Sequence, residues 1–438
     1  MGCKVCKFGG SSLADANQFR KVKNILLADP ERRYCVPSAP GKRHRDDEKI
    51  TDMLYKCYRL ARRDEPYDDL FQKIATRYLD IVKELSLDID LAPMLEEVRI
   101  EIARRGPDYA ASRGEYFSGR ILANYLGWDF IDPREAVMFD RQGVFAGEWT
   151  NSLLSERLKH HAHAVIPGFY GALPDGDIHT FSRGGSDITG AIVARAANAE
   201  IYENWTDVSG FLMADPRIVD NPKVIRQLTY HELRELSYMG ATVLHEDAVF
   251  PVRKAGIPTN IRNTNAPEEP GTMIVDKGEP LPDTDTVITG VAGHKDFTLL
   301  SIEKAMMNSE IGFGRRVLQA IEDNGVSFEH LPTGIDTMCV IIRDNDLMQC
   351  KERIVSRIEE LCHPDSIVFS TGLALIATVG RGMVNQRGTA ARLFGALANA
   401  DVNVRMIDQG SSELNIIVGV DVDDFEKAVR AIYNEFVD

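Results

Sequence analysis

Residues 3–26 read CKVCKFGGSSLADANQFRKVKNIL, and this stretch decides the fold class. The apolar segment before the glycine pair at 9–10 is short and bounded by a turn signal, which predicts a buried β-strand. Beyond the glycines, apolar residues recur over 19–26 at the spacing of an amphipathic helix. Ser12 and Asp15 are residue types that favour the start of such a helix. The stretch therefore predicts a strand, a glycine turn and a helix, in that order.

Strand and helix patterns keep alternating up to about residue 265. A long helical region at 51–125 is interrupted near Pro66, near Pro93 and at the pair 106–107. Strands that alternate with helices form a mostly parallel sheet with helices on both faces, so we expect an α/β domain. Further strands are predicted at 33–42, 163–172, 178–185 and 201–210, and a further helix at 187–199.

Composition and charge narrow the class of protein. A chain of 438 residues suggests two or three domains, and the hydrophobic share of 44% is typical of a globular protein. The net charge of −15 argues against a nucleic-acid partner, because phosphate binding needs a basic face. No long apolar run or signal-peptide pattern occurs, so we expect a cytoplasmic protein without a membrane partner. Cys3 and Cys6 have the C-x-x-C spacing but no second such pair occurs in the sequence, and we expect the seven cysteines to be reduced.

The amino-acid composition changes in the stretch 263–286, which is rich in Pro, Asp, Glu and Thr. This change predicts a domain boundary near Thr284, and hence domains at 1–284 and 285–438.

The second of these domains contains an internal repeat. Placing Val326 on Val402 also matches Gly334 with Gly410. Both copies show a helix, two strands joined by a tight loop, and another helix. The repeat therefore predicts two small βαββαβ units.

The first glycine loop, KFGGSS at 7–12, has the composition of a phosphate cradle. Glycines let backbone N–H groups approach an anion, the following helix adds partial positive charge, and Lys7 adds a full one. A tight turn would explain the glycine pair equally well. The loop is not a Walker P-loop, because the G-x-x-x-x-G-K-[ST] spacing is absent from the sequence.

A second cluster occurs in FSRGGSDITG at 181–190. Arg183 can grip a carboxylate or phosphate, Ser186 can cap the following helix, and Asp187 falls in the first helical turn. The alternative is an ordinary capped helix whose aspartate complements the helix dipole. A nucleophile elbow is excluded, because Ile188 stands where that motif needs glycine.

Together with Gly114-Glu115 and TDVSGFLMADPR at 206–217, these loops resemble the aspartate kinases, a branch of the amino acid kinase family. VIPGFYG at 165–171 and QGSSELNI at 409–416 extend the resemblance over nearly the whole chain. The resemblance implies a three-layer αβα amino acid kinase fold with a mostly parallel open sheet. It also implies two ferredoxin-like βαββαβ ACT modules at about 295–365 and 370–438, either in tandem or interleaved.

For the activity, the resemblance implies transfer of the γ-phosphoryl group of ATP, with Mg²⁺, to the β-carboxylate of L-aspartate, a first step toward lysine, threonine and methionine. That carboxylate is ionised at pH 7, because its pKa is near ~3.9. The site therefore needs charge neutralisation rather than a general base, and no metal site built from protein side chains alone is expected.

The implied catalytic residues are Lys7 and Asp187. The implied substrate-binding residues are Ser38, Thr51, Glu115, Phe169, Arg183, Gly185 and Ser186, with Glu115 on the substrate ammonium and Arg183 on its α-carboxylate. The implied nucleotide-binding residues are Gly9, Gly10, Ser11, Thr206, Asp207, Asp215, Arg217 and Thr242.

The chain departs from the family pattern in GATVLHEDA at 240–248. Thr242 occupies a position where the family has a lysine that would contact ATP phosphates, and Glu246 replaces a proline. A cation must then come from elsewhere. The candidates are Lys42, Arg43, Arg45, Arg253 and Lys254.

The ACT modules imply feedback control by lysine or threonine in a homodimer or a dimer of dimers. The alternative is that these strands only form the dimer. The implied effector residues are Met307, Ser309, Gly312, Phe313, Gly334 and Asp336.

Two rival functions remain open on the sequence. One is a kinase of the same fold that acts on acetylglutamate, glutamate or a nucleotide. The other is a regulatory amino-acid-binding protein whose kinase domain has decayed, with Thr242 as a symptom. Glu115 and the C-terminal repeat favour aspartate over the first rival, and Lys7 with Asp187 argues against the second.

Overall fold

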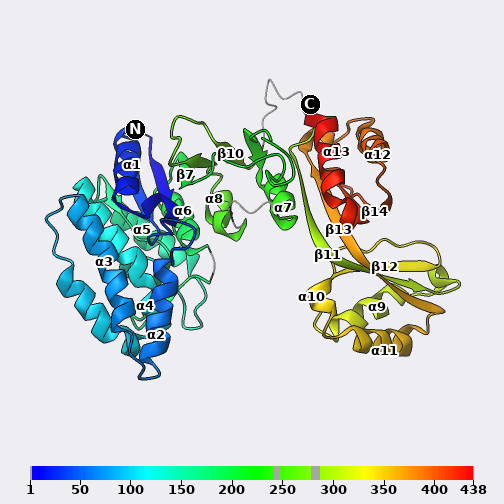
Figure 1. Cartoon of the computed structure of the whole chain (residues 1–438), viewed down its shortest axis with the longest axis horizontal. Helices are drawn as coiled ribbons and strands as arrows, with labels where there is room; N and C mark the ends of the chain where they lie inside the picture. Colours follow the sequence, from blue (N-terminus) through cyan, green and yellow to red (C-terminus); the bar gives the residue numbers. More distant parts are fainter. Residues whose placement is uncertain (1, 183, 241–243, 245, 278–286, 438) are drawn as a thin grey trace. The chain divides into compact units, whose positions relative to one another are not determined.

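The structure is a computed structural model that describes residues 2–182, 184–240, 244, 246–277 and 287–437 (Figure 1). The described residues form two compact units. The first contains the chain up to Phe211, Arg226–Tyr230 and the described residues from 244 to 277. The second contains Leu212–Ile225, 231–240 and the residues from 287 onward. The predicted boundary at Thr284 lies outside the described residues.

The first unit is built on one sheet with the strand order β3-β4-β2-β1-β7-β9-β10-β8. All neighbouring strands are parallel except the antiparallel pair β9 and β10, which confirms the predicted α/β class. The strands are β1 (Lys4–Phe8), β2 (Arg32–Pro37), β3 (Asp129–Phe130), β4 (Ala164–Val165), β7 (Ile201–Thr206), β8 (Gln227–Thr229), β9 (Thr259–Asn263) and β10 (Thr272–Val275).

Helices cover both faces of this sheet, as the alternating pattern predicts. Side chains of α1, α2, α3 and α4 form one core with Cys6, Phe8 and Trp205 of the central strands, and Figure 1 shows α2, α3 and α4 side by side. Helix α6 packs on β1, β2 and β7. The helices of this unit are α1 (Ala16–Leu27), α2 (Ile50–Ala61), α3 (Asp68–Glu84), α4 (Ala92–Leu126), α5 (Gly147–Leu158), α6 (Gly185–Ala196) and α8 (Phe250–Lys254), while α7 (Tyr230–Tyr238) begins at the last residue of a first-unit segment.

Two irregular features of this unit, a helix kink and a separate hairpin, follow from local backbone chemistry. Helix α4 kinks at Gly106, whose φ of 90° and ψ of 175° are not helical, directly before Pro107. The stretch at 178–185 does not add a strand to the main sheet. Its β6 (Ile178–Thr180) pairs antiparallel with β5 (Tyr170–Ala172), because a short turn through Gly176, with φ of 89°, folds the chain back.

The second unit contains one antiparallel sheet with the order β12-β11-β13-β15-β14. Figure 1 shows α9 beside α11 and α12 beside α13. Its strands are β11 (Gly290–Glu303), β12 (Thr337–Arg343), β13 (Ser366–Val379), β14 (Val404–Asp408) and β15 (Asn415–Asp421). Its helices are α9 (Phe313–Glu322), α10 (Asp344–Leu347), α11 (Lys351–Cys362), α12 (Thr389–Asn399) and α13 (Phe425–Val437).

The two repeat copies share the long strands β11 and β13. The pairing of β11 with β13 shifts register at Phe297. On its other side, β11 pairs with β12 through residues 297–303, and β13 pairs with β15 through residues 373–379. The two repeat copies are therefore joined in one sheet through β11 and β13. The first copy has isolated bridges at His330 and Thr333 in place of the strand that corresponds to β14.

In the described parts of the chain, none of the helices has the length and apolar character that a membrane crossing requires.

Candidate active site

Lys7 and Asp187 lie in contact at the carboxyl end of β1. Lys7 is only 7% exposed, and its Nζ lies 2.6 Å from Asp187 Oδ1 in the first turn of α6. Strand alternation explains the placement, since Cys6 and Phe8 enter the core with α1 and Lys7 must face α6. The structure therefore brings together the two residues predicted to be catalytic.

The glycine loops after β1 and β2 pack backbone against backbone. The amide of Gly41 donates to Gly10 O at 2.7 Å, and the amide of Gly9 donates to Trp205 O at 2.9 Å. A Cβ atom on Gly10 would lie 2.9 Å from Ala39 O, and one on Gly41 would lie 2.6 Å from the carbonyl carbon of Gly10. A larger residue at either glycine would push the loops apart. Both glycine positions are thus needed for close approach.

Neighbouring residues anchor these loops. Ser12 does not cap α1, contrary to one reading of the sequence, because its hydroxyl pairs with Thr264 Oγ1 at 2.7 Å. Asp15 is the N-cap instead, and its carboxylate accepts from the amide of Gln18. The predicted nucleotide residue Ser11 lies in the short 3₁₀ segment that follows the glycines.

Glu115 is a buried carboxyl group in α4, and it lies beside the β2 loop. Burial raises its pKa to about 8, although the backbone amide of Ala39 partly offsets this by hydrogen bonding to it. The Oε2 atom of Glu115 is buried and has no hydrogen-bond partner among the described residues. An unpaired buried carboxyl oxygen is costly, so this group is suited to a cationic ligand.

The turn after β4 packs on the N-terminus of α6. Phe169 adopts a φ of 80°, and its amide donates to Thr189 Oγ1 at 3.0 Å. A Cβ atom on Gly185 would lie 2.5 Å from the Phe169 ring. Ser186 is not the helix cap, contrary to the prediction, because Gly184 occupies the cap position in a left-handed conformation. Arg183 lies outside the described residues.

Ser38 and Thr51 flank the β2 loop. The amide of Ser38 donates to Phe8 O at 3.0 Å, which extends the pairing of β1 with β2. Thr51 lies in the first turn of α2 and is half-buried.

The remaining predicted nucleotide residues divide between the two units. Thr206 ends β7, and its hydroxyl donates to the exposed carboxylate of Asp207 at 3.2 Å. Asp215 and Arg217 belong to a segment of the second unit. There the Arg217 guanidinium bonds to Asp215 and lowers the pKa of that carboxyl. Thr242 lies outside the described residues.

Three of the cations considered as substitutes for a lysine at 242 have partners. Arg43 pairs with Asp47, Lys254 pairs with Glu148, and Arg253 lies over the ring of Tyr230. Lys42 and Arg45 are exposed, and the Lys42 Nζ donates to the Arg45 carbonyl at 3.3 Å.

Two structural features of the candidate site were not predicted from the sequence. Asn204 of β7 contacts both Lys7 and Asp187, and Arg77 of α3 ties the β2 loop to the helices through Asp47 and the Gly41 carbonyl. A polar Asn in an otherwise buried strand was the available signal for the first.

The predicted effector residues gather where two loops of the second unit meet. The amide of Lys304 donates to Asp336 O, and the amide of Met306 donates to Asp336 Oδ1, both at 2.9 Å. Phe313 is buried directly after Gly312, which caps α9 in a left-handed conformation. Met307 and Ser309 lie in the 3₁₀ segment before α9, and Gly334 closes the facing turn by donating to Thr337 O.

Comparison with known proteins identifies the relatives of the chain. Residues 2–263 match the amino acid kinase family, and residues 376–436 match the ACT domain. Aspartokinase 3 of Bacillus subtilis is 40% identical over 455 residues, which cover 99% of this chain and 98% of that protein. The crystal structure of Clostridium acetobutylicum aspartate kinase is 53% identical, with a TM-score of 0.92 over 100% of both chains. Escherichia coli aspartokinase III in complex with lysine and aspartate is 25% identical, with a TM-score of 0.74 over 100% of both chains.

The similarity to the Bacillus and Clostridium proteins extends over both units, and it agrees with the sequence motifs that resemble those of the aspartate kinases. The chain therefore belongs to the amino acid kinase family, as one of its aspartokinases.

Proposed function

We propose that the chain uses ATP to phosphorylate the β-carboxylate of L-aspartate, which gives 4-phospho-L-aspartate. The observation that carries this proposal is the buried Lys7 ammonium, held by Asp187 beside the packed glycine loops. A fixed positive charge at that place suits a transfer in which negative charge builds between ATP and an attacking carboxylate. The acceptor carboxylate is already ionised, so the site needs no base.

Substrate recognition in this proposal depends on Glu115 and Arg183. The buried Glu115 carboxyl, with its unpaired Oε2, would bind the ammonium of the amino acid. Arg183 would bind the α-carboxylate in a bidentate fork. A site that requires both groups rejects compounds that lack either one. Ser38, Thr51, Phe169, Gly185 and Ser186 would shape the remaining walls.

For the nucleotide, we propose that Gly9, Gly10 and Ser11 hold the phosphates, and that Thr206, Asp207, Asp215 and Arg217 serve ATP. The described residues include no group of three His, Cys, Asp or Glu side chains that could hold a metal alone. The proposed site would instead bind Mg²⁺ that arrives with ATP, because such an ion is held by one or two carboxylates together with phosphate oxygens. Mg²⁺ would neutralise phosphate charge, and the exposed Asp207 would supply one carboxylate to it.

For regulation, we propose feedback inhibition by lysine or threonine at the loops that carry Met307, Phe313 and Asp336. Two findings support feedback control, although neither concerns these loops directly: a match to the ACT domain at 376–436, and the E. coli relative solved in complex with lysine and aspartate. We also propose a cytoplasmic homodimer or dimer of dimers, with the kinase activity in 1–284 and the regulation in 285–438.

A hydroxamate assay with ATP tests the activity against both rivals. Aspartate should give the acyl phosphate, whereas glutamate and acetylglutamate should give little. Turnover of glutamate with none of aspartate would assign the chain to another substrate. Binding of aspartate without turnover would instead indicate a decayed kinase domain.

A further inference from the structure

We propose that Asn204 is a positioning residue for phosphoryl transfer, which fixes the ammonium of Lys7 and the carboxylate of Asp187 in one arrangement. This role rests on the proposed function, because it concerns the same site. Asn204 is 3% exposed and lies on β7, the strand next to β1.

The three side chains form a closed ring of polar contacts. Asp187 Oδ1 accepts from Lys7 Nζ at 2.6 Å and from Asn204 Nδ2 at 2.7 Å. Asn204 Oδ1 in turn accepts from Lys7 Nζ at 3.4 Å. Each member therefore contacts both others, and the amide of Asn204 uses its donor and its acceptor in the same ring.

The ring sets the direction of the free donor on Lys7. An ammonium group has three N–H donors. Two are taken by Asp187 and Asn204, and no other partner of the Lys7 Nζ occurs among the residues that the structure describes. The third donor is thereby aimed away from both side chains. Gly9 lies next to the ammonium, since a Cβ atom there would be 3.6 Å from Lys7 Nζ. We expect the third donor to meet an oxygen of the transferring phosphoryl group at the glycine loop.

Asp187 alone would not fix this direction. A single carboxylate can hold an ammonium over a range of rotations, and the long lysine side chain has several low-energy rotamers. The second acceptor on Asn204 removes that freedom. The Asn204 Nδ2 donor also selects which oxygen of Asp187 faces Lys7, so that both charged groups are fixed by one neutral amide.

A second network on the opposite face of the sheet keeps Asn204 in register with Lys7. The pairs Cys6 with Glu203 and Lys7 with Asn204 are successive cross-strand neighbours of β1 and β7. Side chains of successive residues point to opposite faces, so Glu203 faces the α1 side. A register slip of one residue would exchange the two faces and remove Asn204 from the site.

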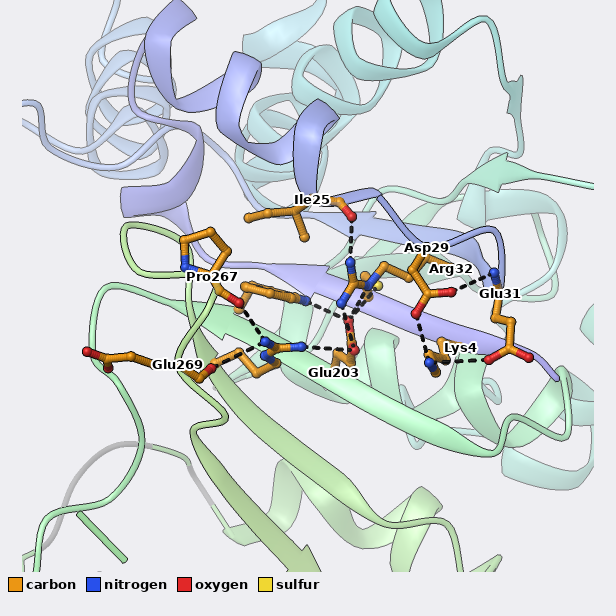
Figure 2. A network of polar contacts seen from close by, with 11 residues as sticks. Lys4, Ile25, Asp29, Glu31, Arg32, Glu203, Pro267 and Glu269 are labelled. Carbon is orange, nitrogen blue, oxygen red and sulfur yellow. Dashed lines mark hydrogen bonds and ion pairs between the residues drawn. The ribbon is translucent and has the colours of Figure 1, made fainter. Parts of the chain in front are cut away.

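Figure 2 shows the network that opposes such a slip. Glu203 accepts from Arg32 Nε at 2.8 Å and from Trp205 Nε1 at 3.0 Å, and it also pairs with Arg262. Arg32 donates in addition to Ile25 O at 2.6 Å. Buried polar groups that are satisfied in this way specify one register, because any other leaves charges unpaired.

Kinetics of Asn204→Leu and Asn204→Ala test the role. Both variants remove the amide. Leucine keeps nearly the volume of asparagine, whereas alanine is smaller and cannot clash with its neighbours, so at least one variant is expected to fold. We expect kcat to fall about 10- to 100-fold, the scale on which a small misplacement of a reacting group slows catalysis. The KM values for ATP and aspartate should change little, because Asn204 positions Lys7 and does not itself bind either substrate.

Asn260→Leu is the matched control. Asn260 lies on β9 in register with Glu203, and therefore on the face opposite Lys7. Asn260 is less buried than Asn204. A general structural effect of leucine on an inner strand of the sheet would lower the melting temperature and folded yield of Asn204→Leu and Asn260→Leu alike. Unchanged kcat in both Asn204 variants, or an equal loss in Asn260→Leu, would overturn the role of Asn204.

Reductive methylation of Lys7 in the ligand-free protein gives a readout that needs no turnover. Mass spectrometry should show faster methylation of Lys7 in both Asn204 variants than in wild type and Asn260→Leu, since the ammonium is no longer held on two sides. Equal rates would overturn the proposal even if kcat falls. If wild type makes no aspartyl phosphate, the proposed function fails, and the methylation rates still decide whether Asn204 positions Lys7.

Discussion

At the scale of single residues, Glu115 is the buried carboxyl group that we propose to bind the ammonium of the substrate. In the ligand-free protein burial raises its pKa to about 8, so the carboxyl is mostly protonated at neutral pH. An ammonium group placed against it stabilises the ionised form. Aspartate binding at pH 7 should therefore release a proton from Glu115, and the affinity for aspartate should rise with pH up to about 8. Calorimetric titration of aspartate in two buffers with different ionisation heats measures this release.

Glu115→Gln provides the control for that titration. This variant keeps the shape of the side chain but does not titrate, so it should bind aspartate more weakly and without the proton release. Its stability relative to wild type should increase as pH rises from 4.5 toward 8, because the folded state resists ionisation of the wild-type carboxyl over that range. Proton release as large as that of wild type would assign the titration to another group.

Single residues of the site could be predicted from the sequence only where they belong to a recognisable motif. Lys7 and Asp187 stood in two glycine loops with recognisable spacing, and the structure places them in contact. Asn204 stood in an ordinary strand, and its role depends on the register of β7 against β1, which local sequence does not encode. Ser186 was predicted to be a cap from its residue type, but a left-handed glycine takes that position.

At the scale of elements, the β2 loop is held in place by a buried ion pair. Asp47 pairs with Arg77 at 2.8 Å, and both side chains are largely buried. Arg77 also donates to the carbonyls of Gly41 and Ala14. This pair therefore keeps Gly41 against Gly10, where we propose that ATP phosphates bind.

Asp47→Ala should loosen this loop. Removing one partner of a buried pair costs about 3 kcal/mol of unfolding free energy or more, because Arg77 is left as an uncompensated buried charge. The KM for ATP should rise as the glycine loops separate. Urea unfolding and ATP saturation curves measure the two effects.

Asp68→Ala is the matched control for that loop. Asp68 also pairs with an arginine at 2.8 Å, but both side chains of the Asp68–Arg99 pair are substantially exposed. Exposed pairs contribute about 1 kcal/mol or less. Similar losses in the two variants would mean that the Asp47–Arg77 pair has no special role.

The order of strands and helices in the first unit was largely predictable, because amphipathic periods and prolines act locally. The break near Gly106, for example, follows directly from Gly-Pro chemistry. The β5–β6 hairpin was not predicted, since strand patterns alone do not say which sheet a short strand joins. Its pairing depends on the turn at Gly176 and on contacts that are distant in sequence.

At the scale of the whole molecule, the second unit couples two repeat copies through shared strands. The repeat and its helices were visible in the sequence, whereas the joining of the two copies in one sheet depends on the pairing of β11 with β13. Such pairing joins residues far apart in the chain, and a local pattern cannot specify it.

Regulation belongs to this scale. We expect lysine or threonine to lower the kinase rate, and Asp336→Ala to weaken that inhibition while the uninhibited kcat stays close to wild type. The Asp336 carboxylate fixes the backbone of Met306, so its loss should disturb the loop predicted to bind the effector. Inhibition curves for both amino acids, measured on the two proteins, provide the test. Indifference of wild type to both amino acids would leave these strands with a dimerisation role alone.

In the function that we propose for the whole chain, phosphoryl transfer to aspartate depends on a positive charge at Lys7. ATP-dependent hydroxamate formation from aspartate, compared between wild type and Lys7→Met, addresses this dependence. We expect rapid product formation by wild type and a loss of about a hundredfold or more in kcat for the variant, as when a group that stabilises transition-state charge is removed. A Lys7→Met enzyme that phosphorylates aspartate at the wild-type rate would contradict the assigned chemistry.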